Sequence, residues 1–169
     1  MESIQTKIRL KKKKKMMNVI NHVVSMDETT INFSGDKNDA FFKAIKNSYT
    51  SAISGKSNQS DEIKKMKGLS GRKFRVMMNH LIKNFDDPKY LEIGSWLGSS
   101  ACSVCFNNKV NITCIDDWSQ NFSTNLDSKK IFKSNLKKFL NEDISPQIIE
   151  KDFRKVDFKK IKNVNIYFY

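Results

Sequence analysis

A glycine-bearing turn and a later aspartate are spaced along the chain in a way that suits a nucleoside ligand. The turn lies within Glu92-Ile93-Gly94-Ser95-Trp96-Leu97-Gly98, and Asp116 follows 24 residues after Glu92. A glycine turn between a strand and a helix lets the backbone approach a ligand closely. An acid at the end of the next strand can accept hydrogen bonds from both hydroxyls of a ribose. The helix N-terminus behind the turn offers free N–H groups and the positive end of a dipole. Together these features predict a nucleoside site with an anionic group near the turn.

The residues of the turn favour a nucleoside without phosphate. A dinucleotide site needs G-x-G-x-x-G, because its second glycine admits a pyrophosphate. Here the spacing is Gly94-x-x-x-Gly98, and Trp96 stands in the place of the middle glycine, where it would obstruct a pyrophosphate. Glu92 would repel phosphate but suits an ammonium group. S-adenosylmethionine carries an ammonium, a carboxylate, a sulfonium and an adenosine, so the charges favour it over a nicotinamide cofactor.

The elements that must position these residues alternate between strand and helix. Apolar runs predict strands over 89–93, 110–115, 147–150 and 164–169, with helices over 99–106 and 127–140 and a short helical piece over 153–161. Such alternation is typical of an α/β fold: a Rossmann-like, partial parallel sheet of about four strands flanked by helices. Ligands bind at the carboxyl ends of such strands. Sites are therefore expected at 92–98, at 116–118 and at Asp152-Phe153.

The residues before the sheet fall into two parts. Residues 1–35 carry the run Lys11 to Lys15 without a sustained period, and we expect a basic, disordered leader there. Residues 36–88 form a helical N-terminal leader to the sheet, with helices expected over 39–53 and 74–85 and a loop over 54–60. Ser70 is expected to cap the second helix, which ends at Asp86-Asp87-Pro88. Residues 89–169 then form an incomplete Rossmann-like cofactor-binding domain.

Four segments resemble the motifs of class I S-adenosylmethionine-dependent methyltransferases. Leu91-Glu92-Ile93-Gly94-Ser95-Trp96-Leu97-Gly98-Ser99-Ser100 is similar to their first motif, in the form E-x-G-x-x-x-G of the branch that includes catechol-type, small-molecule O-methyltransferases. Ile112-Thr113-Cys114-Ile115-Asp116 resembles the second motif and Ile149-Glu150-Lys151-Asp152 the third. Residues 164–169 resemble the fourth strand. The resemblance covers about residues 68–169.

The resemblance implies a role for each candidate residue near the methionine moiety of the cofactor. Glu92 would hold the ammonium. Ser99 and the helix start would hold the carboxylate. The backbone that would line this moiety comes from four residues of the turn: Gly94, Ser95, Trp96 and Gly98.

The adenosine moiety would be held by residues after the second and third strands. Asp116 would bind the ribose hydroxyls, and Asp117 and Trp118 would lie beside the adenine. Asp152 would accept from the adenine amino group, with Phe153 packed on the ring. The implied activity is methyl transfer to an unidentified, small-molecule acceptor, with alignment of the methyl group and the nucleophile as the main source of catalysis. No catalytic residue and no metal site is assigned.

The sequence ends at Tyr169, where the family places an acidic motif and further strands. We therefore expect a C-terminally truncated transferase that carries the cofactor half of the pocket, and an inactive fragment is the alternative. The open edge of the sheet also predicts association between copies of the chain.

Composition leaves a second class of function open. The formal charge of +13 suits a basic nucleic-acid-binding protein with a Rossmann-like core, which would bind with a steep salt dependence. The excess is mostly lysine, however, and A/T-rich codons favour lysine, asparagine, isoleucine and phenylalanine, so nucleic acid is the less favoured partner. Three cysteines give no disulfide framework, and Cys102 and Cys105 are expected to pack in the core. No apolar run is long enough to span a membrane, and a cytoplasmic location is expected.

Overall fold

A computed structural model describes residues 33–120, 122 and 126–169. Almost all of the leader expected over 1–35 lies outside these residues. The contacts within the chain separate Met1–Asp39 from Ala40–Tyr169. The second unit contains the sheet and its helices, and it is the part described below.

Four parallel strands form the sheet, as the sequence predicted. They are β1 (Lys89–Ile93), β2 (Asn111–Ile115), β3 (Gln147–Ile149) and β4 (Ile166–Phe168), in the order β3-β2-β1-β4. The α/β, Rossmann-like fold class is therefore confirmed. The chain proceeds outward from β1 to β3 and then crosses to the other side of β1, so the order of the strands reverses between β1 and β4. In open parallel sheets this reversal marks the usual ligand site.

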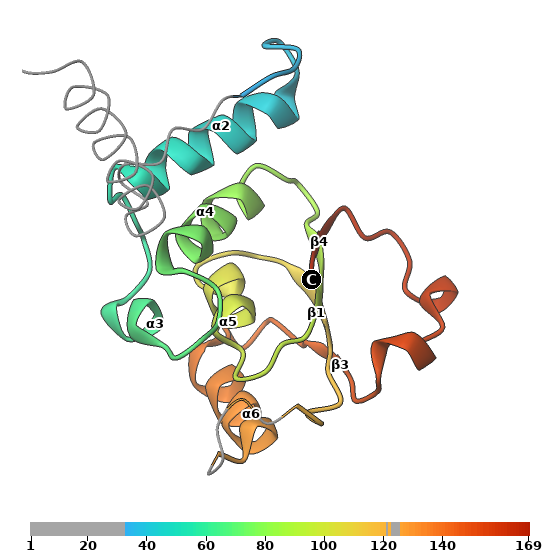
Figure 1. Cartoon of the computed structure of the whole chain (residues 1–169). Helices are drawn as coiled ribbons and strands as arrows, with labels where there is room; N and C mark the ends of the chain where they lie inside the picture. The colour runs from blue at the N-terminus through green and yellow to red at the C-terminus, as the bar shows by residue number, and fades with distance from the viewer. Residues whose placement is uncertain (1–32, 121, 123–125) are drawn as a thin grey trace, which may run out of the picture. The chain divides into compact units, whose positions relative to one another are not determined.

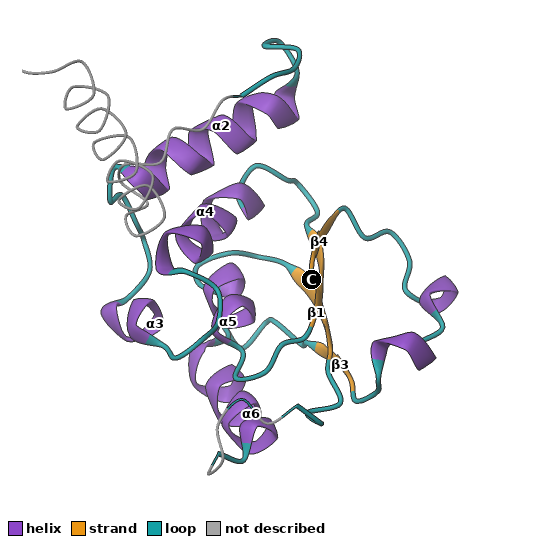
Figure 2. Ribbon diagram, in the orientation of Figure 1, coloured by secondary structure: helices purple, strands orange, loops and turns teal. Residues whose placement is uncertain are grey.

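The helices and the short 3₁₀ turns lie on opposite faces of the sheet (Figures 1 and 2). On one side are α2 (Ala40–Ile53), α3 (Asp61–Lys65), α4 (Arg72–Ile82), α5 (Ser99–Cys105) and α6 (Ser128–Phe139). On the other side the connection from β3 to β4 contains η2 (Phe153–Lys155) and η3 (Phe158–Lys160). No helix of the described residues is both long and apolar enough to cross a membrane.

The core fills the space between the helices and the sheet. Apolar side chains of α4, such as Ile82, and of α6, such as Phe132, are buried at the spacing of a helical stripe. They pack with Tyr90 and Ile112 of the strands and with the buried Cys102 and its neighbours. Cys102 and Cys105 are both free and buried, in agreement with the packing role expected for them.

Two local predictions need correction, and one short helix was not predicted. Residues 153–161 form two short turns rather than one helical piece, because the side chains of Asp152 and Asp157 accept from Arg154 N and Lys159 N and start each turn separately. Ser70 does not cap α4: Gly71 is the N-cap residue, without a side-chain hydrogen bond. The helix α3 was not predicted, although it begins with a common N-cap: Ser60 Oγ accepts from Ile63 N at 3.3 Å.

Gly68 lies in close contact with the start of α5, and its replacement gives a first prediction. A β-carbon at this position would collide with Ser99 Oγ and lie 2.7 Å from Ser99 Cβ. We expect Gly68→Ala to lower the free energy of unfolding by about 2 kcal/mol, the usual cost of overpacking a close contact. Urea denaturation measures this change. The double variant Gly68→Ala/Ser99→Gly should recover much of the loss, and equal stability of Gly68→Ala and the original chain would contradict the contact.

Candidate functional site

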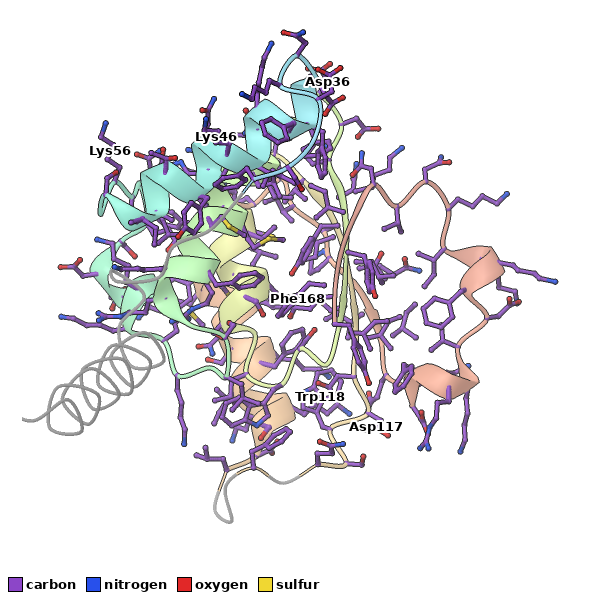
Figure 3. All side chains as sticks on the ribbon, turned by 45° about the horizontal axis from the view of Figure 1, so that its top comes forward. Asp36, Lys46, Lys56, Asp117, Trp118 and Phe168 are labelled. Carbon is purple, nitrogen blue, oxygen red and sulfur yellow. The ribbon has the colours of Figure 1, made fainter. Side chains whose placement is uncertain are left out.

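A cavity of about 250 Å³ lies at the carboxyl ends of the strands, beside the point where the strand order reverses. It receives residues from the ends of all four strands. Its lining comprises Leu69, Ile93, Gly94, Trp96, Ile115, Asp116, Asp117, Trp118, Ser119, Gln120, Phe122, Lys151, Asp152, Phe153, Arg154 and Tyr169. In Figure 3 the labels Asp117 and Trp118 show this end of the sheet. Phe168 of β4 lies on the side of the helices, where its ring packs on Phe74 of α4.

Asp116 holds together the two loops that follow β1 and β2. Its Oδ2 accepts from Trp96 N at 2.7 Å, and its Oδ1 accepts from Trp118 N at 2.7 Å. Both tryptophans have left-handed backbones, with φ of 44° and 51°. Such a conformation is costly for a bulky residue and is found mostly at functional sites. The two charge-assisted hydrogen bonds to Asp116 offset that cost.

The indole rings of these tryptophans also connect the two loops to α6. Trp96 is only 7% exposed, and its Nε1 donates to Ser128 Oγ at 3.1 Å. Trp118 Nε1 donates to Trp96 O at 2.9 Å, and its ring packs on Phe132 at 5.1 Å. The Trp96 ring is thus directed at the first residue of α6. That this ring would obstruct a pyrophosphate stays a prediction.

The start of α5 is covered and does not open into the cavity. Gly98 has φ of 80°, and a β-carbon there would lie 3.0 Å from the Phe132 ring. Ser99 is buried beneath Gly68. Of the eleven candidate residues, seven line the cavity and four do not: Glu92, Ser95, Gly98 and Ser99.

Glu92 lies in the core on the face of β1 opposite to that of Ile93, which lines the cavity. Its side chain is fully buried; Oε2 accepts from Tyr90 Oη at 2.9 Å, and Oε1 has no hydrogen-bond partner among the described residues. Burial raises the pKa of Glu92 to about 7, although nearby hydroxyls of Tyr90, Ser100 and Ser95 act in the opposite direction. Glu92 is therefore partly protonated at neutral pH. Its expected role toward an ammonium stays a prediction.

Asp152 is engaged by a residue that the sequence analysis did not consider. Arg154 donates to its carboxylate through Nε at 2.9 Å and Nη2 at 2.6 Å. These hydrogen bonds lower the pKa of Asp152 to about 2, so the group is ionised across the physiological range. The ion pair places a guanidinium at the cavity beside Asp117. The spacing D-x-R was the available sequence signal.

Aromatic rings form much of the remaining wall. Phe153 and Tyr169 meet edge to face with ring centroids 5.5 Å apart, and Phe122 meets Trp96 at the same separation. Phe122, Tyr169 and Leu69 were absent from the predicted set. Leu69 comes from the segment before α4, which only the tertiary fold brings to the sheet. The resulting cavity has acidic groups beside flat apolar walls, which suits a nucleoside.

Comparisons with protein-family models, curated proteins and solved structures found no match to this chain. Among the described residues, no group of three or more His, Cys, Asp or Glu side chains is arranged to hold a metal ion.

Proposed function

We propose that this cavity binds S-adenosylmethionine and that the chain carries the cofactor site of a methyltransferase. The observation that carries the proposal is the position of Asp116, which ends β2 in a cavity with aromatic walls at the reversal of strand order. An acid at this position of a Rossmann-like sheet is suited to the hydroxyls of a ribose.

The donor set of the cavity fits an adenosine. Each oxygen of Asp116 accepts one backbone N–H and retains a lone pair for a ribose hydroxyl. Trp118 and Phe153 offer ring surfaces for a purine. Asp152 is held ionised by Arg154 and can accept from an exocyclic amino group.

The same surroundings favour a cofactor without phosphate. In a dinucleotide site the pyrophosphate rests on the N-terminus of the helix after β1. Here Gly98 and Ser99 at the start of α5 are covered and do not line the cavity. Three carboxylates line it, Asp116, Asp117 and Asp152, and they outnumber its two cations, Lys151 and Arg154, the second of which is paired with Asp152.

Bound S-adenosylmethionine supplies an electrophilic methyl group on its sulfonium sulfur. The role of the chain's own residues is to bind and orient the adenosine. Orientation of this kind is a large part of methyl-transfer catalysis. The carboxylates that line the cavity would favour the positive charge of the sulfonium. The expectation of a small-molecule acceptor stays a prediction, and no described residue is assigned to removal of the acceptor proton.

Calorimetric titration tests the proposal directly. We expect S-adenosylmethionine and S-adenosylhomocysteine to bind with dissociation constants in the micromolar range, about −8 kcal/mol. NAD⁺ and ATP should bind at least tenfold more weakly, because their phosphates meet the carboxylates without a helix N-terminus to receive them. Preference for NAD⁺ or ATP, or no heat with either adenosyl ligand, would overturn the proposal.

A further inference from the structure

The segment from β3 to β4 combines positive charge with exposed aromatic rings. Residues 151–162 contain six basic residues and two acidic ones. Both acids are engaged, since Asp152 pairs with Arg154 and Asp157 lies 4.0 Å from Lys160. Within the described residues Lys151, Lys155, Lys159 and Lys162 have no carboxylate in ion-pair contact. The positive charge of this segment is therefore available to an outside partner.

The exposed rings lie on the same face of the sheet as that segment. Tyr167 is paired with Leu91 and faces away from the helices, and it is 65% exposed. Tyr169 follows at the next position on that face and is 70% exposed, and Phe158 in η3 is 41% exposed. Figure 1 shows the segment, in red, on the side of the sheet opposite to the helices. Exposed rings gathered on one face of a sheet, beside lysines, are typical of a binding surface.

We propose that this surface binds single-stranded nucleic acid. Lysines satisfy the phosphates, and exposed rings provide faces on which unpaired bases stack; this combination is typical of sites for single strands. An acidic peptide would satisfy the lysines but would make no use of the exposed rings.

The surface is continuous with the cavity, because Lys151, Phe153, Arg154 and Tyr169 belong to both. A strand held here lies at the mouth of the cofactor site. Nucleic acid is then the class of methyl acceptor, in place of the small molecule that the family resemblance implies, a step that rests on the proposed function. Binding of the strand itself does not depend on that function.

Fluorescence anisotropy with labelled single-stranded RNA and DNA of about 12 nucleotides tests the surface without cofactor. The full chain should bind with an affinity that falls steeply between about 50 and 200 mM salt. Lys155→Gln/Lys159→Gln should lower the affinity about tenfold and reduce the salt slope by about 1.4. The control Lys43→Gln/Lys46→Gln makes the same change of charge on exposed residues of α2 and should change the affinity less than twofold.

Phe158→Ala separates stacking from charge and should lower the affinity about tenfold. Three results would contradict the proposed binding surface: equal losses of affinity in the two lysine double variants, no effect of Phe158→Ala, or binding of polyglutamate as tight as that of the oligonucleotides. The comparison of RNA with DNA identifies which strand is preferred.

None of these variants alters a residue of the cavity, so calorimetry with S-adenosylmethionine should give the same affinity for each. Transfer of a tritium-labelled methyl group to the oligonucleotide tests the acceptor step. Label that reaches neither strand overturns that step alone, while failure of the calorimetric titration overturns the proposed function and leaves strand binding standing.

Discussion

Asp116→Ala should abolish most of the affinity for S-adenosylmethionine, with a loss of about 100-fold or more. The carboxylate is expected to accept from two ribose hydroxyls, and a hydrogen bond to a charged group contributes about 1.5–3 kcal/mol. It also accepts from Trp96 N and Trp118 N, so its removal releases two left-handed tryptophans. We expect a loss of about 3 kcal/mol of stability for that reason and a change in near-ultraviolet circular dichroism. Calorimetry and urea denaturation measure the two effects.

Two controls are needed, because the loss of a negative charge and a disordered loop could each weaken binding. For the charge, Asp143→Asn removes a carboxylate from an exposed residue outside the cavity and should leave the affinity unchanged. The contact with the ribose is isolated by comparing adenosine with 2′,3′-dideoxyadenosine. The original chain should prefer adenosine at least tenfold, and Asp116→Asn should lose most of that preference. An equal preference in both proteins would show that Asp116 only positions the loops.

The sheet could be predicted because each strand coincides with a short apolar run in the sequence. The run at 89–93 matches β1 at both ends. The predictions for β2 and β3 are each one residue too long at one end, and the prediction for β4 is two residues too long at its start and one at its end. Alternation of strand and helix then limits the topology to few arrangements. The β3–β4 connection was less predictable, because Asp152 and Asp157 compete locally for the backbone and break one helical turn into two.

The site was predictable where its residues follow directly from a strand. Asp116, Trp118 and Asp152 line the cavity because the carboxyl ends of parallel strands meet there. Sequence spacing could not show that Glu92 faces the helices, since alternation along a strand gives opposite faces but does not say which one holds the ligand. Leu69 comes from the segment before α4, which only the tertiary fold brings to the cavity, so no local pattern indicated it. Tyr169 directly follows β4 and obeys the same rule as Asp116 and Asp152, but sites were expected only at the ends of the first three strands.

The structure also changes the reading of the charge. From composition alone, lysine excess and phenylalanine content have the same explanation in codon usage, and they give no reason to choose nucleic acid. Exposure alone does not separate the two cases, because Phe41 and Phe122 are more exposed than Phe158, at 49% and 52% against 41%. The distinguishing feature is the lysine-rich segment 151–162, whose residues Lys151, Phe153 and Arg154 also line the cavity. This location is the reason to test strand binding.

Glu92→Gln should remove most of the pH dependence of stability near neutrality. Burial raises the pKa of Glu92 from 4.5 to about 7 in the folded chain, so the folded state holds its proton where the unfolded state has lost it. The contribution of protonated Glu92 to the free energy of unfolding is therefore complete below pH 4.5, falls as the pH rises toward 7 and is lost above it. A shift of this size corresponds to about 3 kcal/mol. The variant should be more stable than the original chain by up to that amount at pH 8 and equal to it at pH 4.5.

Urea denaturation across this pH range measures the difference, and Glu142→Gln provides the matched control at an exposed position. Parallel stability curves for Glu92→Gln and the original chain would contradict a buried, protonated Glu92. The same titration with saturating S-adenosylmethionine tests the ammonium contact implied by the family resemblance. An ammonium beside Glu92 favours the carboxylate and moves the fall in stability to lower pH, with ligand affinity rising through pH 7. If Glu92 stays away from the ligand, the fall remains near pH 7 and affinity does not follow it.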